Sequence, residues 1–181
     1  REGRNGKPTV QYELMVTSLG GPADHDGAPM VMGMCHFTPS TPVEIVETEY
    51  PVRIRRFDIW PDSGGAGRTR GGIGFVREYE MLTDVILTAR TANHEQPGWG
   101  VAGGEGPPVC VTTVNPDTPH AVELAALDTR DAPAGTVVRL QQTGGSGYGP
   151  PRERDPDRVR EDVRNGYVTA AMAKEKYGVD I

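Results

Sequence analysis

Between residues 61 and 74 the chain carries six glycines and two arginines, in the order Pro-Asp-Ser-Gly-Gly-Ala-Gly-Arg-Thr-Arg-Gly-Gly-Ile-Gly. Glycine at this density marks backbone that takes positive φ or approaches another group closely. Arginine set between such glycines can present a rigid bidentate fork to a carboxylate or phosphate. A structural turn with a surface arginine pair is the alternative, and the residues alone leave both interpretations open.

The remaining sequence predicts a mainly β, α+β fold. With 36% hydrophobic and 6% aromatic residues, the core must be modest and aliphatic, and 24 glycines and 16 prolines imply many turns between short elements. Alternating or continuous apolar runs predict strands near 10–19, 52–60, 75–82, 85–89, 109–114, 121–126 and 136–143. We expect the strands at 75–82 and 85–89 to pair through a tight link, and a bulge inside 52–60.

A two-helix tail is predicted after Pro150 and Pro151. Asp155 caps the first helix and Pro156 suits its first turn, while Gly166 ends it. Thr169 caps a second helix that runs through Tyr177, and Gly178 stops that helix. Both helices are too short to be stable alone, so they must dock on the rest of the chain.

The organisation expected from these patterns has three parts. Residues 1–19 form an N-terminal segment with the first strand, residues 20–150 an antiparallel β-rich domain with glycine-rich loops, and residues 151–181 the helical tail. The glycine-rich run 144–149 is followed by two prolines and not by a helix. We therefore interpret it as a turn that leads into the tail and not as a dinucleotide loop.

Charge and cysteine content exclude several classes of protein. The net charge of −6 offers no basic face for nucleic acid or an anionic membrane. No apolar run approaches the ~18 residues of a membrane span. Cys35 and Cys110 have no zinc or CxxC spacing, so we interpret them as buried thiols in a reducing cytoplasm. The chain begins with Arg1, and its composition leaves open whether it is a separate gene product or a processed fragment.

Few residues suggest acid–base or metal chemistry. His94 stands beside Glu95 in the long loop 93–108 and is the only candidate for proton transfer, although a plain surface histidine is equally compatible. His25 between two aspartates is more typical of a solvated turn than of a metal site. We expect no metal on this chain.

An acidic stretch precedes the second predicted strand. Glutamates 44, 47 and 49 are followed by arginines 53, 55 and 56. Salt bridges between the two segments are one interpretation, and a place for Glu44 at a substrate edge or subunit interface is the other. Our candidates for anion, substrate or interface contacts are Glu44, Asp62, Gly64, Gly65, Gly67, Arg68, Arg70, Gly71 and Gly72.

Five separated motifs resemble those of the hydantoinase B/oxoprolinase family, in the same order, over about residues 20–181. They are Thr-Pro-Val-Glu at 41–44 with Glu-Tyr-Pro-Val-Arg at 49–53, the glycine-rich stretch 62–74 running into Arg-Glu-Tyr at 77–79, Gly-Trp-Gly at 98–100 with Gly-Gly at 103–104, the run 144–149, and the tail from Arg-Asp-Pro at 154–156. Ser40 and Glu95-Gln96 depart from the family pattern, which puts substrate contacts from those loops in question.

The resemblance implies ATP-dependent chemistry shared between subunits. In this family, which includes hydantoinases, oxoprolinases and lactamases and is related to acetone and acetophenone carboxylases, ATP phosphorylates a carbonyl or enol oxygen on a hydantoinase A partner. The activated species is then hydrolysed or carboxylated on the hydantoinase B side. ATP, magnesium and any divalent metal are accordingly expected on partner subunits, with no cofactor on this chain.

The resemblance covers only the C-terminal portion of a hydantoinase B chain. The acidic and histidine motifs expected in the first part, of the Asn-Asp-Pro-Tyr and His-His-Ala-Asp kind, do not occur in this sequence. It therefore predicts a small subunit that works with a hydantoinase A-like chain and a larger hydantoinase B-like chain. A non-catalytic scaffold subunit and a free-standing β-sandwich ligand-binding module are the alternatives.

Overall fold

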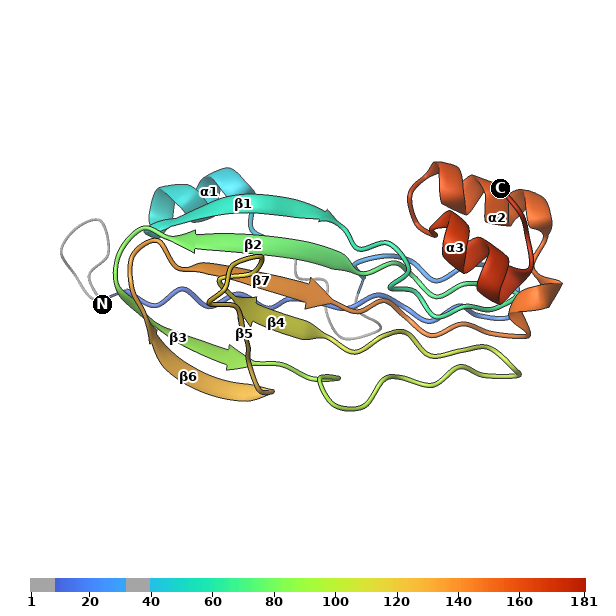
Figure 1. The fold of residues 1–181 in the computed structure, drawn as a ribbon, viewed down its shortest axis with the longest axis horizontal. Helices are drawn as coiled ribbons and strands as arrows, with labels where there is room; N and C mark the ends of the chain where they lie inside the picture. Colours follow the sequence, from blue (N-terminus) through green and yellow to red (C-terminus); the bar gives the residue numbers. More distant parts are fainter. Residues whose placement is uncertain (1–8, 32–39) are drawn as a thin grey trace.

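The computed structural model describes residues 9–31 and 40–181 and shows an elongated molecule (Figure 1). β-Sheet occupies one end and the helical tail the other, and extended segments without regular secondary structure run between them. The predicted mainly β, α+β architecture with a two-helix tail is confirmed.

A five-stranded sheet forms the larger layer, with the order β1-β2-β7-β4-β5 and antiparallel pairing throughout. Its strands are β1 (Val52–Ile59), β2 (Phe75–Met81), β4 (Val111–Val114), β5 (Val122–Glu123) and β7 (Val137–Gln142). A second, two-stranded sheet pairs β3 (Val85–Arg90) with β6 (Leu127–Ala132). The predicted bulge in β1 is confirmed between Ile54 and Arg56.

The predicted pairing of the strands at 75–82 and 85–89 is wrong. β2 pairs with β1 and β7, whereas β3 pairs with β6 in the other sheet. The link between them does not close a hairpin, because the Leu82 N–H donates to the Pro51 carbonyl and the Asp84 carboxylate accepts from the Ala134 N–H at 3.0 Å. These long-range hydrogen bonds fix the link 82–84 between the two sheets, so that β3 leaves the sheet of β2 and pairs with β6. β6 was not predicted, since its sequence Leu-Asp-Thr-Arg-Asp-Ala is largely polar.

The main core lies where the inner face of the large sheet meets the small sheet and α1 (Val43–Glu49). Its buried members are Val46, Val52, Tyr79, Met81, Ala89, Val114, Leu124, Ala132 and Val138. They are mostly aliphatic, as the composition requires. The opposite face of the large sheet carries charged side chains such as Glu78, Glu80 and Arg139, together with Val76 and Val137.

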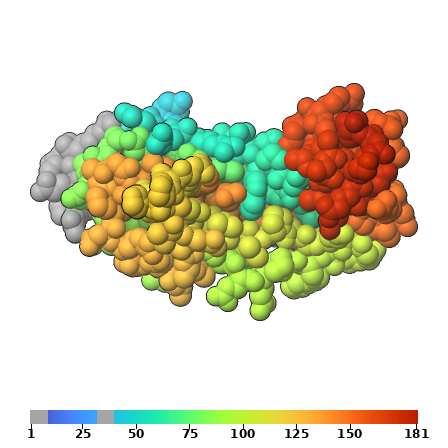
Figure 2. All heavy atoms as spheres, viewed as in Figure 1, coloured from blue at the N-terminus to red at the C-terminus, as the bar shows by residue number. Residues whose placement is uncertain are grey.

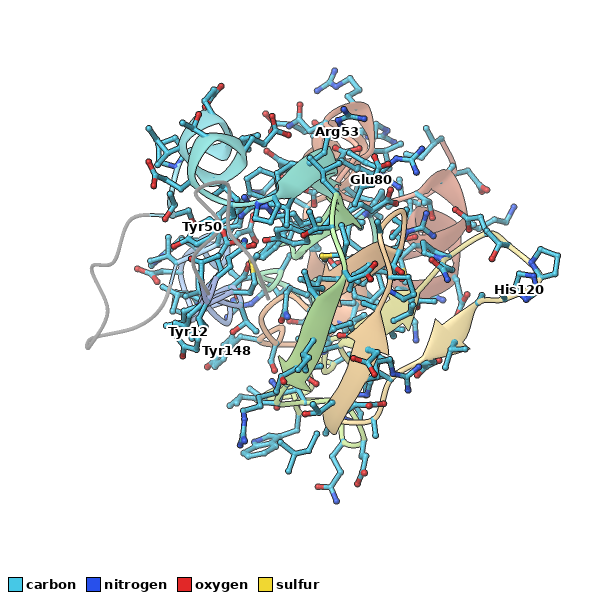
Figure 3. All side chains as sticks on the ribbon, turned by 90° about the vertical axis from the view of Figure 1, so that its left-hand side faces the viewer. Tyr12, Tyr50, Arg53, Glu80, His120 and Tyr148 are labelled. Atoms are coloured by element: carbon cyan, nitrogen blue, oxygen red, sulfur yellow. The ribbon has the colours of Figure 1, made fainter. Side chains whose placement is uncertain are left out.

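Within the described part of the chain, glutamates 44, 47 and 49 do not pair with the arginines of β1 as one interpretation proposed. The Glu47 carboxylate instead accepts from the Ile54 N–H at 2.7 Å, at the bulge. Arg53 lies 3.5 Å from Glu80 across the β1–β2 pair, as Figure 3 shows. Because neighbouring strands place these partners opposite one another, the sheet register decides the pairing.

The strand predicted at 10–19 is also wrong, because this segment belongs to no strand of the described sheets. Its apolar side chains Val10 and Tyr12 are 84% and 83% exposed, and Tyr12 lies at the molecular surface in Figure 3. Glu13 faces the sheet instead, where it accepts hydrogen bonds from Arg77 and from the Tyr79 hydroxyl. A buried Arg77 guanidinium without a carboxylate partner would cost more free energy than is lost by leaving Val10 and Tyr12 exposed. The segment therefore turns Glu13 toward the sheet.

Four extended segments, 18–28, 62–74, 98–107 and 143–149, join the sheet to the tail, and we call them the glycine core. They are held by backbone hydrogen bonds such as Gly65 N–H to Gly145 O at 2.8 Å and Gly72 N–H to Leu19 O at 2.9 Å. A Cβ on Gly71 would lie 1.9 Å from the Gly145 oxygen. Residues 144–149 are thus one of these core segments, and the prediction of a simple turn there is wrong.

Capping residues define the tail as predicted. Asp155 caps α2 (Pro156–Arg164), and its side chain accepts from the Asp157 N–H. Thr169 caps α3 (Ala170–Met172), which continues as the π-helical turn η2 (Ala173–Tyr177). Gly166 and Gly178 both have φ of 73°. No helix within the described residues is long and apolar enough to cross a bilayer.

The second tail helix differs from its prediction in two details. Its last turn is π-helical and not α-helical, and the apolar stripe expected from the spacing of Ala170, Ala173 and Tyr177 is incomplete, because Ala170 is exposed whereas Ala173 and Tyr177 are buried. Ala173 and Tyr177 pack in a second apolar cluster against Ala66 of the glycine core and Val159 of α2. This cluster supplies the docking that the short helices require.

Close backbone packing predicts a severe effect of adding a methyl group. Gly71→Ala should lower the free energy of unfolding by about 3 kcal/mol, because its Cβ would meet the fixed backbone of Gly145. Gly20→Ala is the matched control, with its nearest contact at 3.3 Å, and should change stability by less than about 1 kcal/mol. Chemical denaturation of both variants tests this, and equal midpoints would contradict it.

Candidate functional site

A pocket of about 460 Å³ lies between the glycine core, the long loop and the tail. Figure 2 shows the yellow-green loop residues directly against the red tail. Its lining residues are Asp62, Gly64 and Ala66 of the glycine-rich stretch, Pro97, Gly98 and 105–109 of the loop, and Val168, Met172, Lys176 and Tyr177 of the tail. Two of the predicted site residues, Asp62 and Gly64, therefore face one cavity.

Asp62 ties the glycine-rich stretch to the tail. Its backbone takes φ of 61°, which is uncommon for a residue other than glycine. Its two carboxylate oxygens accept from the Thr169 N–H and hydroxyl, both at 2.8 Å, and its own N–H donates to Tyr167 O. All of these bonds hold the start of α3 in place.

The predicted glycines serve close packing in this structure. A Cβ on Gly65 would lie 2.3 Å from Glu105 O, and one on Gly72 would lie 2.4 Å from Ala28 O. A Cβ on Gly64 would likewise lie 2.6 Å from Gly71 O, and one on Gly67 would lie 2.6 Å from Thr69 O. These contacts explain the glycine requirement without a ligand.

Arg70 is buried and meets an internal partner. Its Nη2 lies 3.4 Å from Asp162 Oδ1 in α2, and its guanidinium stands 5.2 Å from the centre of the Tyr167 ring. Arg154 Nη2 donates to the other oxygen of Asp162 at 2.8 Å. Its Nη1 and Nη2 also donate to the two oxygens of Asp26, at 2.7 and 2.9 Å. We call Asp26, Arg70, Arg154 and Asp162 the charge latch, because their ion pairs join two segments of the glycine core, 18–28 and 62–74, to the tail.

Electrostatics favour the ionised forms of Asp26 and Arg154 in the charge latch. Burial by itself would raise the pKa of Asp26, but the hydrogen bonds and charge of Arg154 outweigh it, so the pKa lies below its usual value. Burial opposes the charge on Arg154, and Asp26 and Asp162 more than compensate, so its pKa is raised. Nearby, burial raises the pKa of Tyr177 to about 12.

Arg68 differs from Arg70 in its surroundings. It is exposed, its guanidinium donates to the Ala23 carbonyl at 3.4 Å and stands 5.9 Å from the centre of the Tyr148 ring, and its side chain passes beside Gly149. No carboxylate within the described parts of the chain forms an ion pair with its guanidinium. Of the two predicted arginines, Arg68 is therefore the one available to an external anion.

His94 and Glu44 do not reach the pocket. His94 is half-buried, and its Nε2 has no hydrogen-bond partner within residues 9–31 and 40–181, but it does not line the cavity. Glu44 is exposed in the first turn of α1, which lies toward the sheet end of the molecule, away from the tail (Figure 1). The structure therefore does not bring together all the predicted site residues.

Sequence reasoning missed the charged residues that shape the pocket. Lys176 Nζ lies 2.9 Å from Glu105 Oε2 across the pocket, and Asp26 and Asp162 anchor the tail. Each pair joins different elements of the structure, so no local spacing signals it. Of these residues, the sequence analysis singled out only Asp26, as one of the two aspartates that flank His25.

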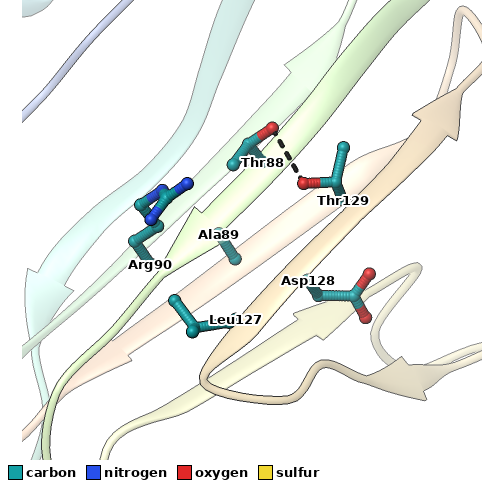
Figure 4. A pocket seen from close by; sticks show the side chains of 6 residues that line it. All are labelled: Thr88, Ala89, Arg90, Leu127, Asp128 and Thr129. Atoms are coloured by element: carbon teal, nitrogen blue, oxygen red, sulfur yellow. Dashed lines mark hydrogen bonds between the residues drawn. The ribbon is translucent and has the colours of Figure 1, made fainter.

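Other possible sites are weaker. Within the described residues, no three His, Cys, Asp or Glu side chains gather as metal ligands. A hollow of about 150 Å³ lies between β3 and β6, where the hydroxyls of Thr88 and Thr129 lie 3.2 Å apart and bond each other (Figure 4). Its hydroxyls are already paired, so we regard the larger pocket as the candidate site.

The charge latch predicts a stability that depends on pH. The carboxylate of Asp26 has a lowered pKa, so its contribution is present above the unfolded value of about 4 and disappears as pH falls through the folded pKa. Asp26→Asn should lower the free energy of unfolding by about 2 kcal/mol at pH 7. The difference from the unaltered protein should shrink below pH ~4.

Hydrogen exchange of residues 151–181 and denaturation between pH 2.5 and 7 measure this effect. Asp24→Asn is the control, because Asp24 lies in the same loop but is 84% exposed and its side-chain partner is the neighbouring His25. If both variants behave alike, the charge latch does not hold the tail.

Comparison with known proteins gives a consistent family. Residues 1–151 match the model of the family described as hydantoinase B/oxoprolinase. The chain is 32% identical over 174 residues to the B subunit of a putative D-/L-hydantoinase of Pseudomonas sp. (strain NS671), covering 95% of this chain and 29% of that protein. It is 32% identical over 183 residues to the beta subunit of the caprolactamase of Pseudomonas jessenii, covering 96% of this chain and 31% of that protein.

Solved structures agree with these relatives. The crystal structure of the ATP-dependent caprolactamase from Pseudomonas jessenii superimposes with a TM-score of 0.81 at 30% identity, over 92% of this chain and 30% of that one. An acetone carboxylase in a nucleotide-free state shares the fold, with a TM-score of 0.74 at 22% identity over 90% of this chain and 26% of that one. The chain spans about 30% of the length of these relatives. It belongs to the hydantoinase B/oxoprolinase family.

Proposed function

We propose that this chain is a small subunit, equivalent to the C-terminal part of a hydantoinase B-like chain, of an ATP-dependent multi-subunit enzyme. The assembly activates a carbonyl or enol by phosphorylation, for hydrolysis of a cyclic amide or carboxylation of a ketone. The observation that carries this proposal is the match to the ATP-dependent caprolactamase over 92% of this chain but only 30% of the other.

The proposed partners are a hydantoinase A-like chain, which binds ATP, and a larger hydantoinase B-like chain. Several relatives are named as members of multi-chain enzymes: the hydantoinase B subunit, the caprolactamase beta subunit and the acetophenone carboxylase delta subunit. ATP, magnesium and any divalent metal belong to those partners in this proposal. We place the assembly in the cytoplasm, in keeping with the buried free thiol of Cys110, whose pKa burial raises.

This chain supplies structure and electrostatics in the proposed reaction. Arg68 can hold a developing negative charge with its exposed guanidinium, while the glycine core keeps its backbone rigid. The N–H of Arg68 donates to Gly149 O at 3.1 Å and that of Thr69 to Tyr148 O at 3.1 Å, which fixes the backbone that carries the Arg68 side chain. His94 remains the only proposed proton-transfer group.

A non-catalytic scaffold subunit is the second candidate. It is favoured by one observation: the buried Arg70 and Asp62 direct their side chains at the tail. Under this alternative, Arg68 contacts a partner subunit and helps to hold the complex together. The two candidates differ in what removal of the Arg68 side chain does to turnover in an intact complex.

Arg68→Ala should lower turnover of the assembled enzyme by roughly 10- to 100-fold, with the complex and the free energy of unfolding unchanged, because an exposed anion contact is lost. Arg68→Lys should recover part of the activity, since the charge stays while the fork geometry is lost. Arg70→Ala should instead destabilise this chain by about 3 kcal/mol, since it leaves the charge latch incomplete.

Purification of the assembly through a tag on this chain tests the proposal directly. Native mass spectrometry should find a hydantoinase A-like and a larger hydantoinase B-like chain, and the assembly should hydrolyse ATP when given a cyclic amide or a ketone with bicarbonate. Isolation of this chain alone, with full ATP-driven turnover, would refute the proposal. An intact assembly whose turnover is insensitive to Arg68→Ala would favour the scaffold.

A further inference from the structure

Trp99 is displayed on a rigid loop. Its side chain is 82% exposed, although its neighbours are held firmly: the Gly149 N–H donates to Val101 O at 3.0 Å, and Gly104 N–H donates to the same oxygen. A Cβ on Gly100 would lie 2.2 Å from the Gly104 backbone. A rigid, exposed tryptophan loses little conformational entropy on binding, which is the property of an interface hot spot.

The candidate pocket opens beside this tryptophan. Pro97 and Gly98, immediately before Trp99, line the pocket, and Val101 two residues later is 56% exposed. Figure 2 shows this part of the loop and the tail forming one continuous surface at one end of the molecule. An exposed aromatic side chain and a pocket are therefore next to each other along the loop, and both features are typical of the centre of protein interfaces.

The polar groups of the pocket are already engaged. Both oxygens of Asp62 bind Thr169, and Lys176 is paired with Glu105. The other side chains that line it are largely apolar, and come from Pro97, Pro107, Pro108, Val109, Val168 and Met172. A small polar substrate needs convergent, unused polar groups for orientation, and the pocket offers none of its charged side chains for that purpose. An apolar protein side chain fits it better.

We infer that this surface, made of Trp99, Val101 and the pocket, docks the larger hydantoinase B-like chain, with Trp99 entering an apolar recess of the partner and an apolar partner side chain entering the pocket. The inference rests on the proposed function. The relatives carry the equivalent of this chain within a polypeptide about three times longer, so the remaining two-thirds must contact it. Lys176 pairs with Glu105, and the Asp62 carboxylate is bonded to Thr169, so the charged side chains that line the pocket are engaged within this chain, in keeping with a largely apolar contact.

Photo-crosslinking in the native assembly tests the placement. The residue p-benzoylphenylalanine is placed at position 99 of the tagged chain, or at position 86 as a control, because Ile86 on β3 is 59% exposed in the separate two-stranded sheet. Position 99 should crosslink to the larger hydantoinase B-like chain, and position 86 should crosslink to that chain far less. Equal yields from the two positions, or crosslinks from 99 to another chain alone, would overturn the inference.

Affinity measurements separate its two parts. Trp99→Ala and Met172→Arg should each weaken binding of the purified larger chain by about 30-fold or more, while Ile86→Ala changes it less than about 3-fold. Thermal unfolding of each variant checks that the chain still folds, and Trp99→Phe should retain part of the affinity.

Two further outcomes distinguish the inference from the proposed function. If the larger chain copurifies but Trp99→Ala and Met172→Arg leave its affinity unchanged, only the inference fails. If no such chain copurifies, both fail. Hydantoin, 5-oxoproline and ε-caprolactam serve as small-molecule probes by NMR titration, and saturable binding that Met172→Arg abolishes would show a substrate pocket and overturn the docking assignment.

Discussion

Direct contact between glycine backbones is the constraint on which the rest of this structure depends. Segments from four parts of the chain approach so closely that a single added Cβ would overlap a carbonyl, as at Gly71 against Gly145. Such packing satisfies buried backbone groups through hydrogen bonds that link all four segments, such as Gly147 N–H to Glu105 O. It yields a rigid spacer that carries no side-chain bulk, and it fixes the distance between the β-sheet and the tail.

The tail depends on that spacer for two different reasons. Ala173 and Tyr177 bury apolar surface against Ala66, which supplies non-directional stabilisation. The charge latch fixes the orientation of the tail, because the planar Arg154 guanidinium binds the carboxylates of Asp26 and Asp162 at the same time. Together they hold in place the tail residues that line the pocket, Val168, Met172, Lys176 and Tyr177, so a ligand or partner meets a preorganised surface.

These features explain how a chain spanning about 30% of its relatives keeps a defined structure. Its charged groups largely stabilise its own fold, as Glu13 does for Arg77 and Asp62 for Thr169. Among the described residues, the exposed groups that we propose for contact with other molecules are Arg68 and the surface around Trp99. The proposed enzyme therefore assembles its chemistry between chains, with this one contributing one cationic contact and a docking surface.

Local sequence determined the features that depend on neighbours in the chain. The helix caps Asp155 and Thr169, the stop at Gly166, most strand positions and the need for glycine at 64–72 all follow from short-range sterics and hydrogen bonding. Tertiary structure decided which strands pair, which side of residues 10–14 faces the sheet, and that Arg70 turns inward to Asp162. Those outcomes depend on partners far away in sequence, where the desolvation of a buried charge outweighs local pattern, and a single sequence does not show which distant groups will meet.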